Sequence, residues 1–319
     1  MQDAHTLVSA RHLLPDRQNY ENLPFFSLII PTYNRRHRLP ACLESALQQT
    51  FEDIEIILVD DGSTDRTGEW VRDTYKDPRL RYFYKKNEER SIARNYGIAR
   101  AQGRFVFFLD SDDELLPEHF AVLYENIQKH PDIHRFTTKF KTRSLSGKLL
   151  PSRIRHLSEG EYDYRLLLKG NIFNSMLCLR RTEPPIYPFP PQFRIGEDWV
   201  FMVGNTYRHP LYLIDKETCI SNDHAGRTMR ENNRKIVEAK LANAAFLCRE
   251  FAFSEEEERI LRGHAYEFCA VHSYLDYDRR EAMHFLRKAV SHLGWNHERQ
   301  LLALKIQVGK RFIERLQGR

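Results

Sequence analysis

Hydrophobic positions in residues 26–130 follow two alternating patterns. Four short apolar runs have the length of buried strands: 26–30, 55–60, 80–84 and 105–109. Between them, apolar residues at helical spacing predict an amphipathic helix at 39–49, a turn and N-cap signal at 61–65 opens a second helix at 66–75, and a third is expected at 91–101. Alternating strands and helices are typical of a parallel sheet covered by helices on both faces. Sheets of this kind bind ligands at the carboxyl ends of their strands.

The second half of the chain is divided between an irregular part and a helical part. Pro31 is predicted to break the first strand. Residues 135–195 lose the alternation of strands and helices and contain a proline cluster at 184–191. A helical pattern returns at 196–203. From Asn232 onward we expect only helices: 234–252, 255–276, 279–293 and 298–316. The resulting domain prediction has four parts: an N-terminal arm 1–24, an alternating half 25–130 and an irregular half 131–231 forming one domain 25–231, and a helical extension 232–319.

Composition places the chain among ordinary globular proteins, with 41% hydrophobic and 29% charged residues. No apolar run approaches the roughly 20 residues that cross a bilayer, and the first residues lack the pattern of a secretory signal. We therefore expect a cytoplasmic protein, with contact to the inner face of the membrane as an option. The five cysteines are an odd number without a CxxC pair, which predicts neither a disulfide framework nor a zinc site.

Positive charge gathers in two regions of a chain whose formal net charge is +5. Residues 135–181 hold eleven Lys or Arg against three acids, and residues 298–319 hold six against two. Either an anionic partner or a solvated face explains such a bias. In the second region, Leu301, Leu304, Val308, Phe312 and Leu316 form an apolar stripe. That stripe fits an anionic membrane surface, a dimer contact or the core.

A cluster of acids follows the fourth predicted strand directly. Asp110, Asp112 and Asp113 lie within four positions, with Ser111 between them. Three carboxylates at one strand end repel each other, and a bound divalent cation removes this repulsion while attracting a phosphate. The pattern therefore indicates a metal-bridged diphosphate. An Asp-rich turn that caps the helix expected near Pro117 is the structural alternative.

Five motifs in this order resemble the family 2 glycosyltransferases of the GT-A fold, across residues 26–230. They are Pro31-Thr-Tyr-Asn34, Val59-Asp-Asp-Gly-Ser-Thr-Asp65, Ala93-Arg-Asn-Tyr-Gly97, Leu109-Asp-Ser-Asp-Asp113 and Glu197-Asp198. The resemblance implies an α/β fold with a Rossmann-like, mostly parallel sheet and helices on both faces, followed here by an all-helical C-terminal extension. It also implies a nucleotide-diphospho-sugar donor lying across the strand ends.

The resemblance assigns donor-side roles position by position. The residues expected to bind the nucleotide-sugar are Pro31, Tyr33, Asp61, Arg94, Asp110 and Ser111, with Tyr33 stacking on the base and Asp61 accepting its N–H. The metal, Mn²⁺ or Mg²⁺, is expected on Asp112 and Asp110, with His224 within reach. Each role has a structural alternative: a turn for Asp61, a core position for Tyr33, a solvated helix position for Arg94 and a plain loop for His224.

The pair Glu197-Asp198 matches the acceptor-side motif of that family. Transfer to a hydroxyl requires removal of its proton, and we expect Asp198 to be this general base, with Glu197 orienting it or the acceptor. A base opposite the leaving diphosphate implies one in-line displacement, which inverts the anomeric centre. Two acids that merely favour a helix start are the alternative. No Gln-x-x-Arg-Trp motif of processive synthases occurs, so we expect transfer of one sugar at a time.

Together these features predict a metal-assisted inverting hexosyl- or N-acetylhexosaminyltransferase, with a UDP-sugar favoured as donor. Its acceptor would be a glycan or lipid-linked glycan, as in polysaccharide biosynthesis. The main alternative is a nucleotide-sugar or carbohydrate binding protein without transferase activity. A nucleotidyltransferase or a dinucleotide oxidoreductase would require a glycine-rich loop after the first strand, and residues 31–38 contain no glycine. A nucleic-acid partner is not expected, because no nucleic-acid motif is present.

Overall fold

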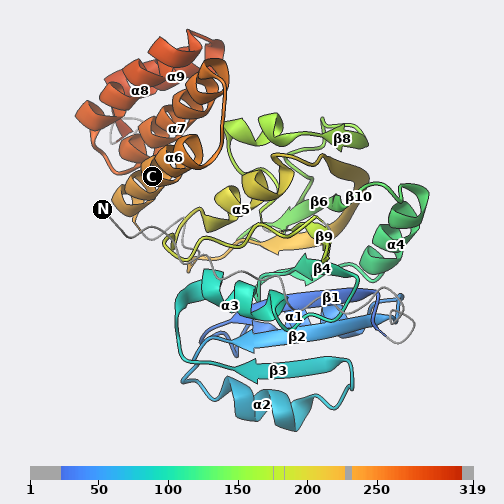
Figure 1. The fold of residues 1–319 in the computed structure, drawn as a ribbon. Coiled ribbons are helices and arrows are strands. Elements are labelled where there is room, and N and C mark those ends of the chain that lie inside the picture. The colour runs from blue at the N-terminus through green and yellow to red at the C-terminus, as the bar shows by residue number, and fades with distance from the viewer. Residues whose placement is uncertain (1–22, 175, 183, 227–231, 311–319) are drawn as a thin grey trace, which may run out of the picture.

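A twisted sheet with helices on both faces forms the centre of the protein (Figure 1). The computed structural model describes residues 23–310 apart from 175, 183 and 227–231. The predicted N-terminal arm 1–24 therefore lies almost wholly outside the described residues. The first part of the chain alternates strands and helices: β1 (Phe26–Thr32), α1 (Leu39–Leu47), β2 (Ile54–Asp60), α2 (Thr67–Thr74), β3 (Leu80–Tyr84), α3 (Glu89–Ile98) and β4 (Phe105–Phe108).

The second part of the chain adds shorter and less regular elements to the same sheet. They are β5 (Glu114–Leu115), α4 (His119–Lys129), β6 (Arg135–Arg143), β7 (Leu149–Leu150), β8 (Gly160–Tyr162), a 3-10 turn (Tyr164–Lys169), β9 (Cys178–Arg180), α5 (Glu197–Thr206) and β10 (Leu211–Asn222). The strand order is β3-β2-β1-β4-β9-β6-β10-β5. Strands β1 to β4 pair in parallel, whereas β9 runs antiparallel to both β4 and β6.

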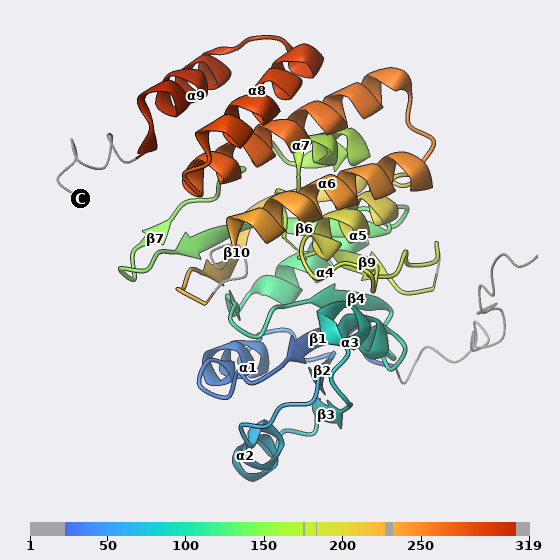
Figure 2. The same cartoon turned by 90° about the vertical axis from the view of Figure 1, so that its left-hand side faces the viewer.

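Side chains of the parallel strands alternate between two hydrophobic cores, one on each face of the sheet. Leu28 and Phe107 belong to the core shared with α1, α2 and α4. Ile29 and Phe108 belong to the core shared with α3 and α5. Figure 2 shows α1 and α3 on opposite sides of β1. This period of two is what a strand buried on both faces requires. The predicted α/β architecture is thereby confirmed.

Among the described residues, four helices follow the sheet, as predicted: α6 (Asn233–Glu250), α7 (Glu255–Leu275), α8 (Arg279–Leu293) and α9 (His297–Val308). Ala244 of α6 and Leu261 of α7 join the core that contains α5. Helices α8 and α9 pack on α7 around a smaller core of their own, which includes Phe285 and Ile306. The first two helices of the extension are therefore attached to the face of the sheet on which α5 lies.

One prediction about strands was wrong, and two strands were missed. Pro31 does not break the first strand, because β1 continues to Thr32 and pairs with β2 along its whole length. The ladder with β4 ends at Ile29 opposite Phe108, so past that point β4 does not require the N–H that proline lacks. The strands β6 and β10 were not predicted. Lys139 is buried in β6 with its amine 2.5 Å from Asp215 of β10, a pairing that the local pattern does not reveal.

The last predicted helix differs from the structure as well. Helix α9 ends at Val308 rather than Leu316, and Gly309 follows it with a φ of 89°. Of the predicted apolar stripe, Leu301, Leu304 and Val308 are exposed, while Phe312 and Leu316 lie outside the described residues. The described members of the stripe are therefore not core residues. Within the described part of the chain, none of the helices has the length and apolar character that crossing a bilayer demands.

Candidate active site

A cleft of about 660 Å³ opens at the carboxyl ends of β1, β2 and β4. Its walls also include the first turn of α5 and side chains of α6 and α7. The cleft brings together nine of the residues predicted from the sequence: Pro31, Tyr33, Asp61, Arg94, Asp110, Ser111, Asp112, Glu197 and Asp198. The tenth, His224, contacts Asp112 from the loop after β10. Residues far apart in the sequence thus converge on one cavity.

The nucleotide side of the cleft is formed by the ends of β1 and β2. Tyr33 follows β1, lines the cleft and is 47% exposed, so it is not a core residue. Asp61 follows β2 and is buried. Its carboxylate accepts hydrogen bonds from the Lys85 amine at 2.6 Å and from the backbone N–H of Glu88 at 3.1 Å. Asp61 is therefore a charged acceptor already held in place, which is more than a turn residue needs.

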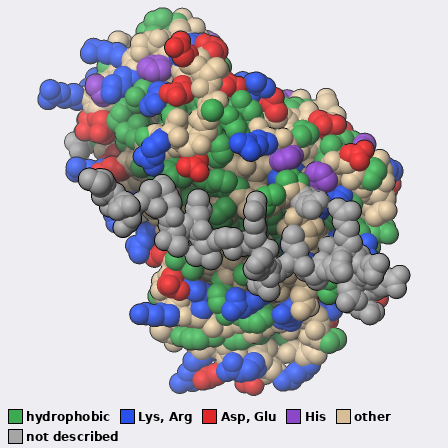
Figure 3. Space-filling model, in the orientation of Figure 1, with side chains coloured by type: hydrophobic (Ala, Val, Ile, Leu, Met, Phe, Trp, Pro, Cys, Tyr) green, Lys and Arg blue, Asp and Glu red, His purple; other side chains and the backbone are tan. Residues whose placement is uncertain are grey.

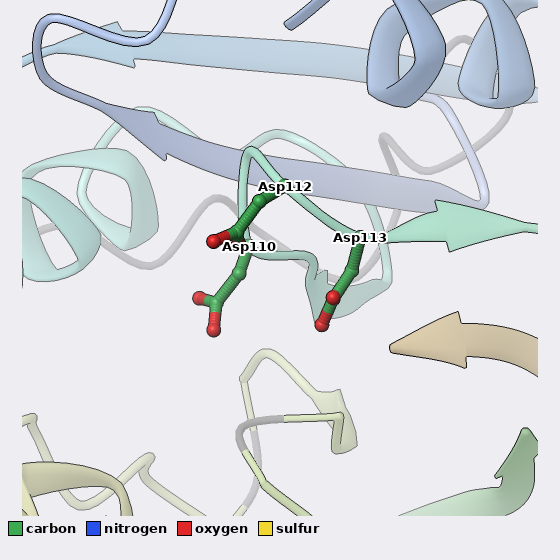
Figure 4. A group of neighbouring side chains, drawn as sticks. All are labelled: Asp110, Asp112 and Asp113. Carbon is green, nitrogen blue, oxygen red and sulfur yellow. The ribbon is translucent and has the colours of Figure 1, made fainter. Parts of the chain in front are cut away.

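The turn after β4 carries the three carboxylates, which project to the same side of the turn (Figure 4). Ligand oxygens of Asp110, Asp112 and Asp113 lie within 4.8 Å of one another. Hard oxygen ligands in such a group fit Mg²⁺ or Mn²⁺. Asp113 does not cap the following helix, since no side chain caps α4. It accepts the backbone N–H of Asn222 at 2.8 Å and so connects the turn to β10.

Asp112 is held by two basic side chains. Its Oδ2 lies 2.7 Å from the Arg35 guanidinium and 2.7 Å from Nε2 of His224. Burial alone would raise the pKa of the Asp112 carboxyl, but the hydrogen bond from His224 and the charge of Arg35 lower it below its ordinary value. Asp112 is therefore ionised, as a metal ligand must be. Its partner Arg35 was not predicted, although it lies in the polar loop after the first strand.

Arg94 of α3 joins the donor side of the cleft to the acceptor side. One Nη atom lies 2.6 Å from Asp110 and the other lies 2.9 Å from Glu197. The guanidinium is buried and stacks over Phe189 at 4.9 Å. Burial lowers the pKa of Arg94, but the two carboxylates outweigh it and raise the pKa above its ordinary value. The alternative interpretation, that Arg94 is a solvated residue on a helix, is therefore wrong.

Asp198 has a different environment from the other acids. It lies in the first turn of α5 and its carboxylate accepts the backbone N–H of Trp199 at 2.8 Å. Burial, followed by the negative charge of Glu197, raises the pKa of Asp198 to about 6. A carboxyl with a pKa near neutrality is suited to accept a proton from a hydroxyl. The two adjacent acids thus have distinct environments, since Glu197 is paired with Arg94.

The helical extension contributes directly to the cleft, which the sequence did not indicate. Ile236, Lys240 and Asn243 of α6 and Phe268 of α7 line it. The Asn243 carboxamide donates to the carbonyl of Ile195 at 2.8 Å. It packs against Gly196, which has a φ of 76° and precedes the acid pair. The extension therefore fixes the loop from which Glu197 and Asp198 start.

Known proteins resemble this chain in sequence. Residues 27–178 match the family model described as Glycosyl transferase family 2. An uncharacterized glycosyltransferase of Haemophilus influenzae is 43% identical over 166 residues, which are 51% of this chain and 64% of that protein. One of Rickettsia bellii is 31% identical over 231 residues, 68% of this chain and 30% of that protein. The chain spans about a third of the length of the first curated relatives it matches.

Solved structures of glycosyltransferases share the fold. Residues 1–349 of TarS from Staphylococcus aureus, solved with UDP-GlcNAc, match with a TM-score of 0.60 and 19% identity over 88% of this chain and 91% of that one. The mannosyltransferase PcManGT from Pyrobaculum calidifontis, solved with GDP-Man and Mn²⁺, matches with a TM-score of 0.57 and 16% identity over 92% and 83%. The fold is thus the GT-A fold, and the sequence matches support a family 2 glycosyltransferase.

Proposed function

We propose that this chain is a metal-dependent, inverting glycosyltransferase of family 2 that moves one sugar from a nucleotide-diphospho-sugar to a hydroxyl group. One observation carries the proposal: Asp61, Asp112 and Asp198 line a single cleft although they lie far apart in the chain. Their surroundings differ in the way that the reaction requires. Asp61 and Asp112 are paired with cations, whereas Asp198 has a raised pKa.

On the donor side, we propose that Tyr33 stacks on the base beside Pro31 and that Asp61 accepts a hydrogen bond from the base N–H. Asp110, Asp112 and His224 would hold Mn²⁺ or Mg²⁺, whose charge would stabilise the departing diphosphate. Ser111 and Arg94 border the same space. A uracil base has the N–H that a carboxylate at Asp61 can accept, so a UDP-sugar is the favoured donor.

On the acceptor side, we propose that Asp198 removes the proton of the incoming hydroxyl as its oxygen bonds to the anomeric carbon. The bond from that carbon to the diphosphate breaks in the same displacement, and the configuration inverts. Glu197, held by Arg94 at 2.9 Å, orients this side of the cleft relative to Asp110. In this proposal, residues 25–130 bind the nucleotide and residues 131–231 bind the acceptor. The extension 232–319 adds side chains to the acceptor side of the cleft.

The test is a screen of nucleotide-sugars for release of the nucleotide in the presence of Mn²⁺, with and without candidate glycan acceptors. UDP-N-acetylglucosamine and GDP-mannose come first, because the structural neighbours were solved with these donors, and UDP-hexoses follow. We expect wild-type protein to release nucleotide from one of them, and Asp198→Asn to bind that nucleotide but not turn it over. Binding without release by wild-type protein would favour a nucleotide-sugar binding protein without transferase activity.

The acceptor of such an enzyme is a glycan or a lipid-linked glycan, as in polysaccharide biosynthesis, and the exposed side of α9 bears on the second option. Leu301, Leu304 and Val308 are exposed there, and Figure 3 shows hydrophobic side chains gathered among charged ones over the helical extension. We propose a surface contact through 298–319, with an anionic membrane or a second copy of the chain. Flotation with anionic vesicles and sedimentation of the free protein distinguish the two.

A further inference from the structure

Most cations of the basic region 135–181 are bound to partners within the protein. Examples are Lys139 with Asp215 at 2.5 Å and Arg165 with Glu257 at 2.8 Å. For four of the eleven cations, the described residues supply no side-chain ion pair or hydrogen bond: Lys148, Arg153, Arg155 and Lys169. Of these four, only Arg153 lines the cleft. Most of the positive charge in this region is therefore paired within the protein, and of the four cations without such a partner Arg153 faces the cleft.

A second cation reaches the cleft from α6. The Lys240 amine lies 3.2 Å from the centre of the Trp199 ring and 5.2 Å from that of Phe268. Within the part of the chain that the structure describes, Lys240 forms no ion pair with a carboxylate. Burial lowers the pKa of Lys240 to about 7. A partly buried ammonium that forms no ion pair has lost part of its hydration, and an anionic ligand in contact with it would offset that loss.

These two cations differ from those on the donor side of the cleft. Arg35 is paired with Asp112, and Arg94 is paired with Asp110 and Glu197. Lys240 instead packs on Trp199, the residue after Asp198. The Lys240 amine thus lies next to the residue that follows the proposed general base, and Arg153 lines the same cleft.

We propose that Lys240 and Arg153 form an acceptor subsite that binds an anionic group, a phosphate or a carboxylate, carried by the acceptor near the hydroxyl that reacts. The subsite rests on the proposed function, because it presumes that an acceptor enters beside Asp198. It assigns acceptor selection to the basic half of the sheet domain and to the first helix of the extension. A phosphate would receive a charge-assisted hydrogen bond from each cation.

The experiment compares matched ligands on protein loaded with UDP and Mn²⁺, so that the diphosphate position is occupied. The probes are glucose, glucose 6-phosphate and glucuronate, titrated by calorimetry. We expect glucose 6-phosphate to bind at least about tenfold more tightly than glucose, and glucuronate shows whether a carboxylate suffices. Equal binding of all three, or a phosphate preference that appears only without UDP, overturns the subsite.

Variants test whether a preference for the anionic ligands depends on Lys240 and Arg153. Arg153→Gln and Lys240→Gln should each reduce the ratio of phosphate to neutral affinity by about threefold to tenfold, and Lys240→Arg should retain most of it. The matched controls Arg155→Gln, two residues away and exposed, and Lys235→Gln, exposed on the same helix, should leave the ratio unchanged. A ratio that survives in the double variant R153Q/K240Q contradicts the proposal, and melting curves establish that this variant is folded.

Failure of the subsite and failure of the proposed function give different results. Nucleotide release from a sugar donor, without any preference for anionic ligands, would support the transferase and contradict the subsite. A phosphate preference that depends on Lys240 and Arg153, without nucleotide release from any donor, would support the anion-binding site and contradict the transferase. The release assay needs no acceptor beyond water or a simple sugar, so the two measurements are independent.

Discussion

The cleft holds the acids of its donor side and the proposed general base of its acceptor side in opposite ways. On the donor side, Asp61 is paired with Lys85 and Asp112 with Arg35. On the acceptor side, Asp198 accepts a backbone N–H, and its pKa is raised to about 6. A carboxylate whose charge is compensated by a side-chain cation can exchange that cation for a bound one. An acid without such compensation keeps a pKa in the range that proton transfer needs.

The largest effect should come from Asp112, the donor-side acid held by two basic side chains. Asp112→Asn should lower transfer by about a thousandfold, because the charge that would hold the metal is lost. Chelation of metal should reduce wild-type protein to the same level and leave the variant unaffected. Steady-state rates across a Mn²⁺ titration measure both effects. The exposed acid Asp73 provides the control Asp73→Asn, and metal-dependent activity in Asp112→Asn would contradict the assignment.

Asp61 should show a smaller effect, restricted to donor binding. In Asp61→Asn the shape of the side chain and the contact with Lys85 are largely kept, but the charged acceptor for the base is lost. We expect the KM for the donor to rise about thirtyfold, roughly 2 kcal/mol, with kcat changed by less than about threefold. Initial rates at varied donor concentration separate the two parameters. A change in kcat alone would place Asp61 outside the base pocket.

The same contrast decides what the sequence could predict. On the donor side, each strand is followed directly by its functional residues and each helix covers the strand before it, so local periodicity identified β1 to β4 and the loops that bear Tyr33, Asp61 and Asp110. Lys85 follows β3 by the same rule, and that rule could have identified it. Arg35 likewise lies within the loop already assigned to the site.

The acceptor side could not be predicted in this way, because its sheet is built from strands far apart in the chain. β9 lies between β4 and β6, and β10 pairs with β6 across about 75 residues. Charged residues such as Lys139 are buried there by partners that the local pattern does not show. Lys240 and Asn243 reach the cleft only because α6 packs on α5. No motif marks them.

The dependence of the acceptor side on the extension can be measured through Gly196. Its φ of 76° disfavours other residues, and an added Cβ would lie 2.2 Å from Nδ2 of Asn243. Gly196→Ala should lower the free energy of unfolding by about 2 to 3 kcal/mol, measured by urea denaturation. Gly147→Ala has a similar φ of 80° with no atom within 4 Å, so it isolates the backbone cost, about 1 kcal/mol.

The result at Gly196 also separates the two sides functionally. We expect Gly196→Ala to impair acceptor transfer more than nucleotide binding, because the displaced loop carries Asp198 and no residue of the base pocket. Equal stability losses in Gly196→Ala and Gly147→Ala would mean that Asn243 does not hold the loop. In that case the extension would be an attachment rather than part of the site.

The smallest expected effect is a shift in pH dependence that only the acceptor side should show. A general base must be ionised, so kcat/KM should rise with pH up to about 6, the raised pKa of Asp198, and then level off. In Glu197→Gln the like charge that contributes to this raised pKa is removed. The rising limb should therefore move to lower pH by about half a unit, equivalent to roughly 0.7 kcal/mol.

Since Glu197→Gln also changes the absolute rate, the position of the limb is the measurement. Asp61→Asn should lower the rate without moving the limb, because Asp61 is not among the groups that act on Asp198. A limb that stays in place in Glu197→Gln, or one that moves equally in both variants, would mean that the titrating base is not Asp198.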